Sequence, residues 1–452
     1  MHLPKINVVY RAVFSGNLLI FACGTAVTWS ISQLSKLADP ETTPFKVAPT
    51  PEQLPWMTSL LTLGAAMGPF LFGYMADKFG KKPALLYLGA PFVACQPFLA
   101  FSANVEAFYV ARFLLGLGLG GAFIVMPIYI GEISDKADRG ALSTSMSCFA
   151  CLGILFSCSL GPYVDIAVFN MVLALFPAVF LVAFYRFAPE SPHFYVSIND
   201  LDSARSVLQQ IRVGHETVEK ELAEIQACVV DQSQLGMTDI FASKATIRAL
   251  IISVGLLVFQ QFSGINAVIF YSHQIFAQTG TELAPEICTI IVVAVQFLSS
   301  FLTPVVVDKF GRKIILLLSA MGMALSEIPL GVYCYLRTLH VDVTAVSLLP
   351  VVALAAFIFF FNVGFGPLPW ALLSELFPAS IKSIATASVS SLIWILAFFA
   401  TKYFEVMVAT VGIGQLFLFF AFCCLLASIF VIFCVVETKG KSLKEVQDLL
   451  NA

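Results

Sequence analysis

The sequence predicts an all-α membrane protein of twelve transmembrane helices, arranged as two pseudo-symmetric bundles of six. Three observations lead to this prediction. First, 59% of the 452 residues are hydrophobic and only 12% are charged, whereas soluble domains carry about 25% charged residues. Second, the apolar residues fall into twelve long runs. Third, one pattern of charges occurs in both halves of the chain.

The runs are counted from the length that a bilayer requires, which is about 20 residues for a helix. Six runs precede a polar stretch and six follow it. We place the spans at residues 12–34, 55–75, 83–103, 107–130, 140–162, 166–187, 247–271, 285–307, 314–335, 346–372, 383–405 and 413–436. The predicted units are an N-terminal bundle (1–187), a cytoplasmic linker (188–246), a C-terminal bundle (247–436) and a cytoplasmic tail (437–452).

The linker contains two segments, Leu201–Ile211 and Glu216–Ala227, with apolar residues at helical spacing and charges of both signs. This pattern predicts short amphipathic helices on the cytoplasmic side. They either simply connect the bundles or brace a gate between them.

The distribution of basic residues predicts the orientation. Of the 25 Lys and Arg residues, only Lys36, Lys46, Arg337 and Lys402 lie in predicted outer loops or at the outer end of a span, and Arg112 lies inside the fourth span. All others lie on the side of the two termini. Because cytoplasmic loops are enriched in Lys and Arg, both termini are predicted to be cytoplasmic. We also expect a multi-pass protein of the plasma membrane, with an internal membrane as the alternative.

The composition also excludes some classes of function. A net charge of −3 gives no indication of a nucleic-acid partner. Nearly all of the eleven cysteines lie in apolar runs, where cysteine packs as a small hydrophobic residue. The five histidines are scattered, without metal-ligand spacing or a nucleophile beside a base. We therefore expect no metal, no cofactor and no enzymatic activity, and a monomer whose partners are the lipid bilayer and a small molecule.

The repeated charges lie at the cytoplasmic ends of predicted spans. GYMADKFGKK in the first half matches VDKFGRK in the second, YIGEIS matches LLSELF, and PESP matches VETKG, each about 240 residues apart. Two homologous halves in a membrane are typical of transporters that alternate between two states. Ion pairs could then close a cytoplasmic gate reversibly; alternatively, the charges only anchor helix ends. The predicted gate residues are Asp77, Lys81, Glu132, Arg139, Glu190, Asp308, Arg312, Glu375, Lys382 and Glu437.

These motifs resemble those of the sugar porter family of the major facilitator superfamily, over essentially the whole chain. The resemblance also includes RFLLGLGLGG at Arg112–Gly121, QQFSGINAVIFYS at Gln260–Ser272, GFGPLPW at Gly364–Trp370 and ETKGKSL at Glu437–Leu443. Within the family, the chain is most similar to insect facilitated trehalose transporters and related facilitative glucose transporters.

The resemblance implies a sugar site in the second half. Polar side chains in a membrane helix are costly unless they face protein or water, and amides offer both a donor and an acceptor to sugar hydroxyls. The alternative role for the amides is hydrogen bonding between helices. Gly264 and the Gly-Pro run before Trp370 are expected to bend their helices. The predicted sugar contacts are Gln260, Gln261, Asn266, Gln296, Asn362, Trp370 and Trp394, and the predicted extracellular gate is Phe270 with Tyr271.

The sequence departs from the family pattern at several positions. Ser147 stands where glucose carriers usually have Gln, and His193 stands where relatives have a basic residue after PESP. The shorter Ser147 predicts a wider cavity, which suits a sugar larger than glucose or different from it.

Coupling to protons is judged from the acidic residues. Proton-driven sugar porters generally carry one in the first span, and Asn7–Ala38 contains none. Glu327, about 22 Å into the membrane at 1.5 Å per residue, is the exception. We therefore expect a uniporter for trehalose or a hexose such as glucose. The alternatives are a proton-coupled symporter and a sugar sensor that does not transport; sensors typically have long tails, and the segment after Glu437 is short.

Overall fold

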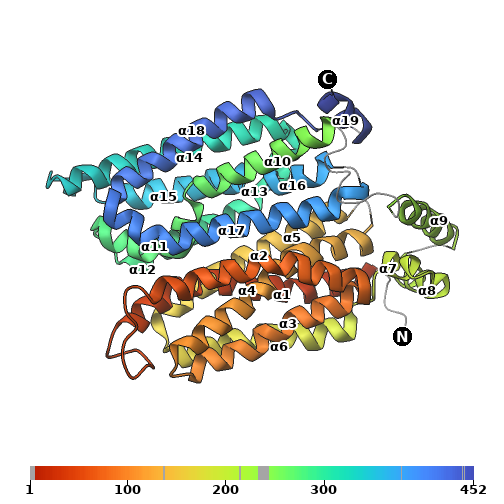
Figure 1. Cartoon of the computed structure of the whole chain (residues 1–452), viewed down its shortest axis with the longest axis horizontal. Coiled ribbons are helices and arrows are strands. Elements are labelled where there is room, and N and C mark those ends of the chain that lie inside the picture. The colour runs from red at the N-terminus through yellow and green to blue at the C-terminus, as the bar shows by residue number, and fades with distance from the viewer. Residues whose placement is uncertain are drawn as a thin grey trace.

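A computed structural model of the chain describes residues 6–135, 138–212, 215–232, 244–377, 379–439, 441 and 443–451. Within these ranges the regular elements are helices, and no strand occurs. The helices form two bundles that lie side by side, one coloured red to yellow and the other green to blue (Figure 1). The all-α class and the two predicted bundles are confirmed.

The first bundle consists of six continuous helices that agree with the predicted spans to within several residues. They are α1 (Ile6–Ala38), α2 (Leu54–Phe79), α3 (Lys81–Phe101), α4 (Val105–Ile133), α5 (Arg139–Leu160) and α6 (Ile166–Phe187). A 3-10 turn at Gly161–Tyr163 separates α5 from α6.

The second bundle differs from the prediction in one respect, because three of its spans are not single helices. The seventh span is divided into α10 (Lys244–Phe262) and α11 (Ile265–Thr279), the eighth into α12 (Pro285–Ser300) and α13 (Leu302–Phe310), and the tenth into α15 (Leu349–Phe360) and α16 (Leu368–Leu376). The continuous helices are α14 (Arg312–Thr338), α17 (Ala379–Val411) and α18 (Ile413–Cys434).

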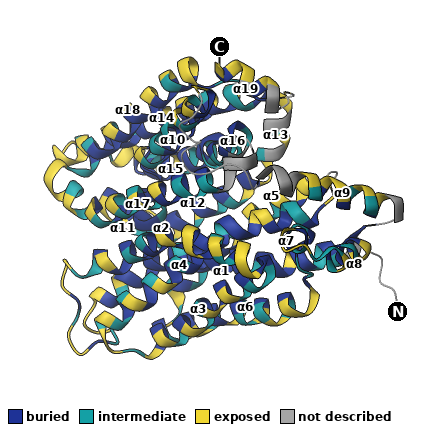
Figure 2. Ribbon diagram, turned by 45° about the vertical axis from the view of Figure 1, so that its right-hand side comes forward, coloured by how far each residue is buried: buried dark blue, intermediate teal, exposed yellow. Residues whose placement is uncertain are grey.

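The surface of the bundles suits a lipid environment. Among the described residues, eleven helical stretches are long and apolar enough to cross a membrane, and α12 is a shorter apolar helix that continues as α13. Large apolar side chains such as Val182 and Phe433 are 74% and 81% exposed on the outside. Exposed residues lie along the outer surfaces of the bundles (Figure 2). Burying such side chains in lipid removes the cost of hydrating them.

Short helices lie at one end of the bundles, which we call the terminal face because α1 begins and α18 ends there (Figure 1). They are α7 (Pro192–Ser197), α8 (Leu201–Ile211), α9 (His215–Gln232) and α19 (Leu443–Asn451). The two helices predicted in the linker are confirmed as α8 and α9, whereas α19 was not predicted. Arg212 ties this layer to the first bundle: its Nε lies 2.7 Å from Glu221 Oε2, and its Nη1 donates to the carbonyl oxygen of Ile133.

Among the described residues, the two bundles contact each other mainly through α2 with α17, α5 with α12, and α1 with α11. At the end remote from the terminal face, which we call the opposite face, Ile31, Ile154, Cys158 and Val293 form an apolar cluster. This cluster joins α1 and α5 of the first bundle to α12 of the second, so the bundles are packed together at the opposite face.

Candidate functional site

The polar segment predicted to bind sugar lies where α10 ends and α11 begins. Gly264 has φ +77°, a left-handed conformation that favours glycine. A Cβ atom there would lie 2.5 Å from the ring of Phe420. The predicted bend at Gly264 is therefore confirmed. The break also brings two amides together that a continuous helix would align poorly. Asn266 Nδ2 donates a hydrogen bond to Gln261 Oε1.

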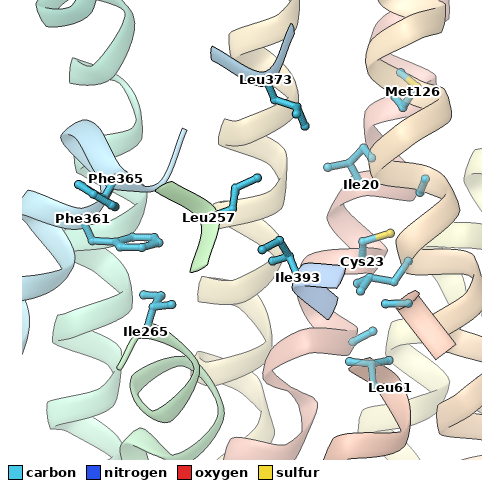
Figure 3. Close-up of a cluster of buried hydrophobic side chains, with 14 of the residues drawn as sticks. Ile20, Cys23, Leu61, Met126, Leu257, Ile265, Phe361, Phe365, Leu373 and Ile393 are labelled. Carbon is cyan, nitrogen blue, oxygen red and sulfur yellow. The ribbon is translucent and has the colours of Figure 1, made fainter. Parts of the chain in front are cut away.

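Gln260 connects this break to the break in the tenth span. Its Nε2 donates to the carbonyl oxygens of Phe365 at 2.6 Å and Gly366 at 2.9 Å. Figure 3 shows Phe361 and Phe365 above Ile265 and to one side of Leu257. In this conformation both N–H donors of Gln260 serve the protein, so Gln260 braces the two interrupted helices against each other.

The break in the tenth span is a π-helical turn at Phe361–Phe365, followed by Gly366 and Pro367. Ser319 of α14 supports this turn, because its Oγ donates to the Phe360 carbonyl oxygen at 2.7 Å and accepts the Phe365 N–H at 2.9 Å. The predicted interruption before Trp370 is therefore confirmed. The hydroxyl of Ser319 satisfies backbone groups that the π turn leaves without helical partners.

The other predicted contacts lie in the π turn itself (Asn362), on α12 (Gln296), on α16 (Trp370) and on α17 (Trp394). Asn362 Nδ2 donates to the Gln296 carbonyl oxygen at 2.7 Å and to Ser299 Oγ at 3.0 Å. Trp370 and Trp394 are half-buried, on α16 and α17. Among the described atoms, Trp394 Nε1 is buried without a hydrogen-bond partner. Because α10 contacts both α16 and α17, the fold places the predicted amides and indoles in one region.

The predicted extracellular gate residues, Phe270 and Tyr271, are buried on α11. The Tyr271 hydroxyl donates to the Thr401 carbonyl oxygen at 2.6 Å, and its ring stacks on Phe404 with centroids 4.7 Å apart. Both partners belong to α17, so Tyr271 fastens α11 to a helix of its own bundle. Since α11 also contacts α1, these residues lie beside the boundary between the bundles.

A small cavity, partly open to solvent, lies between the bundles at the opposite face. His273 Nδ1 and Glu286 Oε1 are 3.9 Å apart at its wall. The cavity contains none of the predicted sugar contacts; its lining is Ile31, Ser32, Ser35, Lys36, Cys158, Pro162, His273, Glu286 and Thr289.

At the terminal face, the first copy of the repeated motif forms a compact cap. The Glu190 carboxylate accepts the N–H groups of the first two residues of α3, at 2.9 and 3.1 Å. Gly80 has φ +103°, and a Cβ atom there would lie 2.3 Å from this carboxylate. Lys81 Nζ lies 3.8 Å from Glu132 Oε1, and Ser191 Oγ donates to Glu132 Oε2. A carboxylate at a helix N-terminus is favoured by the helix dipole.

The second copy builds the same cap on α14. The Glu437 carboxylate accepts the N–H groups of the first two residues of α14, both at 3.0 Å. Gly311 has φ +89°, and a Cβ atom there would lie 2.7 Å from the Glu437 carboxylate. Arg312 Nη2 lies 3.0 Å from Glu375 Oε1, and Thr438 Oγ1 donates to Glu375 Oε2. The sequence repeat thus corresponds to one structural device used twice.

The remaining predicted gate residues are less well defined. Asp77 Oδ1 lies 3.4 Å from Lys81 Nζ, and Arg139 is exposed at the start of α5. The side chains of Asp308 and Lys382 lie outside the described residues. The ion pairs described for this set join helices of the same bundle. A role of these charges between the bundles stays a prediction.

The two capping carboxylates differ in acidity. Burial raises the pKa of Glu190, and the N–H groups that it accepts do not offset this. Burial also acts to raise the pKa of Glu437, but the N–H groups of Lys439 and of the first two residues of α14 outweigh it, so its pKa is lowered. Burial lowers the pKa of His193, whose Nδ1 has no partner among the described atoms. His193 therefore does not replace the missing basic charge at neutral pH.

Arg112 was located in the fourth span by the sequence, but no role was predicted for it. It is fully buried, with Nε donating to the Met57 carbonyl oxygen and Nη1 to the Ala26 carbonyl oxygen, both at 2.8 Å. Its guanidinium lies 4.8 Å from the centroid of Trp29. No carboxylate pairs with it in the described part of the chain. Arg112 therefore joins α1, α2 and α4, and a basic residue inside an apolar span was the only signal for it.

Glu327 lies apart from the amide region. It is fully buried on α14, and Cys424 Sγ on α18 lies 3.6 Å from its Oε2. Its Oε1 has no hydrogen-bond partner among the described atoms. The carboxyl group therefore lies in the seam between two helices of one bundle.

Comparisons with known sequences find sugar transporters. The sequence profile described as "Sugar (and other) transporter" matches residues 12–450. A facilitated trehalose transporter Tret1 of Anopheles gambiae is 34% identical over 98% of this chain, which spans 57% of that protein. The Tret1 of Bombyx mori is 33% identical over 89% of this chain and 80% of its own length.

Solved structures agree on the fold. The proton:xylose symporter XylE, bound to 6-bromo-6-deoxy-D-glucose, superposes with a TM-score of 0.81 at 23% identity, covering 99% of this chain and all of that chain. The inward open conformation of XylE from E. coli gives a TM-score of 0.80 at 24% identity, covering 98% of this chain and 99% of that one.

Proposed function

Because this chain belongs to the sugar transporter family of the major facilitator superfamily, we propose that it is a facilitative carrier of trehalose or of a hexose such as glucose. The observation that carries the proposal is the pair of amides at the break between α10 and α11. Gln261 and Asn266 are held together there by a hydrogen bond, beside a second broken helix. Interrupted helices near the middle of the membrane are typical of substrate sites in transporters.

The amide pair is suited to exchange partners. Each amide offers a carbonyl acceptor and an N–H₂ donor, so sugar hydroxyls can replace the bond between Gln261 and Asn266 without leaving a buried polar group unsatisfied. The unpartnered N–H of Trp394 is available as a further donor, and its indole offers an apolar face to the sugar ring. Gln260 then holds the two breaks in register, in addition to its predicted sugar contact.

Transport in this proposal proceeds by alternating access. The two bundles are packed together at the opposite face through α1, α5 and α12. The capped helix ends at the terminal face make each bundle rigid there, so each can move as a unit. We propose that the terminal face is cytoplasmic, that the protein resides in the plasma membrane, and that it works as a monomer. The predicted gate charges would pair across the bundles in the state that closes this face.

Uniport is favoured over proton coupling by the position of the acidic residues. α1 contains no Asp or Glu. Glu327 lies in the seam between α14 and α18, where its described partner is Cys424 of the same bundle. A coupling carboxylate needs access to water from both sides in turn, and Glu327 is fully buried in this conformation.

The deciding experiment is uptake of radiolabelled trehalose, glucose and fructose into cells that lack sugar transporters, with and without a protonophore. We expect saturable uptake that the protonophore leaves unchanged. Gln261→Ala should reduce uptake about 10-fold or more at equal surface expression, because it removes hydrogen bonds worth about 1–3 kcal/mol. Gln210→Ala, at an exposed amide on α8, is the matched control. Loss of uptake on addition of the protonophore would indicate a symporter, and sugar binding without any flux would indicate a sensor.

A further inference from the structure

One contact between the bundles at the opposite face involves a cation. Lys402 on α17 lies over the ring of Trp56 at the start of α2, with Nζ 4.3 Å from the ring centroid. Phe398, one turn earlier on α17, also faces this indole, with ring centroids 6.1 Å apart. The two partners come from different bundles, so this cation–π contact spans the boundary that must open for a substrate to enter from this face.

One carboxylate from each bundle acts on Lys402. Glu52, which precedes α2, and Glu405, which lies one turn after Lys402 on α17, both act on the ammonium group. Glu405 also accepts a hydrogen bond from Gln274 of α11 at 3.5 Å. No carboxylate of the described residues lies within ion-pair distance of Lys402. The face of Trp56 is therefore its principal contact, and both Trp56 and Glu52 belong to the first bundle.

A second described contact between the bundles at this face is of a different kind. The cluster of Ile31, Ile154, Cys158 and Val293 is apolar, so its strength depends on buried area and not on charge. We propose that Lys402 and Trp56 form a latch that holds the opposite face shut and sets the fraction of molecules open at that face. The proposal rests on the proposed function only in requiring that the two bundles move relative to each other.

The expected size of the effect follows from the exposure of the pair. Cation–π contacts range from weak at exposed sites to stronger when they are desolvated, and both Lys402 and Trp56 are partly exposed. Removing the latch should therefore raise the ratio of open to shut molecules at this face about 2-fold to 10-fold. A contact of this size biases the equilibrium without trapping one state.

The test measures distances between the bundles directly. Spin labels are placed at Ala103, in the loop after α3, and at Ala345, in the loop after α14; both positions are exposed at the opposite face. Double electron–electron resonance then gives the populations of short and long distances, in a background from which the reactive native cysteines have been removed. Lys402→Met and Trp56→Leu should each increase the long-distance population. Lys402→Arg, which keeps the cation, should leave the populations unchanged.

A double-mutant cycle decides whether the two residues act together. In the presence of Trp56→Leu, Lys402→Met should have little further effect. Unchanged populations in Lys402→Met, or effects of the two substitutions that simply multiply, would overturn the latch. The readout is independent of transport: a shift in the labelled protein supports the latch even if no sugar is carried, and uptake without a shift supports only the proposed function.

Discussion

Gly264 offers the sharpest test of how the amide region is built, because Gly264→Ala adds one methyl group at the break between α10 and α11. The backbone there has φ +77°, a conformation that costs an L-residue about 1–2 kcal/mol. The new Cβ atom would also lie 2.5 Å from the Phe420 ring, and crowding of this kind costs about 1–3 kcal/mol. We therefore expect a loss of about 2–5 kcal/mol of stability, together with loss of sugar uptake.

The assay is the temperature at which the detergent-solubilised protein loses its gel-filtration peak, compared with the wild type. Gly73→Ala on α2 is the matched control, because nothing lies within 4 Å of its Cβ position. It should be neutral or slightly stabilising. A double-mutant cycle with Phe420→Ala separates the two costs: the crowding is relieved and the backbone strain remains. Wild-type stability of Gly264→Ala would refute the reasoning.

Three further substitutions test other parts of the structure. Gln260→Ala should reduce uptake about 5-fold or more at normal surface expression, because the carbonyl oxygens that it holds lose their donors; normal uptake would remove Gln260 from the site. Glu437→Gln should lower the unfolding temperature at pH 7 more than Glu190→Gln, because a lowered pKa means that the fold stabilises the ionised carboxylate, and a raised pKa means the reverse. This stabilisation is present above the pKa of an unfolded Glu, about 4.3, and is lost as the pH falls through the lower pKa of the folded state. The difference in unfolding temperature between wild type and Glu437→Gln should therefore shrink below about pH 4. A difference that stays constant with pH would contradict this reasoning. Glu327→Gln should leave uptake, and its insensitivity to an imposed pH gradient, unchanged; abolished uptake in a stably folded variant would point to coupling through this residue.

The sequence was sufficient for the architecture because its signals are local. The lengths of the apolar runs predicted the positions of the spans, and the spacing of apolar residues at 201–211 predicted α8. The repeated charges also predicted a real repeat: Gly80 and Gly311 bring the carboxylates of Glu190 and Glu437 onto the starts of α3 and α14. The sequence assigned these two carboxylates to a gate, and the caps themselves became apparent only in the structure.

The sequence was less informative about the seventh span. Treated as one helix over 247–271, it places Gln261 and Asn266 on poorly aligned faces, and only the left-handed Gly264 turns them toward each other. Gln260 was predicted to contact sugar, yet its amide reaches Phe365, a residue 105 positions later in the chain. A partner of this kind is fixed by how α10 packs against the π turn of the tenth span, and the pattern around Gln260 does not contain it.

The membrane environment, the number of spans, the two related bundles and the family could all be predicted from the sequence, because hydrophobic length and short motifs are properties of contiguous residues. Which polar groups meet became known from the folded structure. It joined Arg112 to carbonyl oxygens of α1 and α2, isolated Glu327 beside Cys424, and placed Lys402 on Trp56. The reason is physical: the energy of a polar group in a membrane depends on its nearest partners, and these come from segments far apart in the chain.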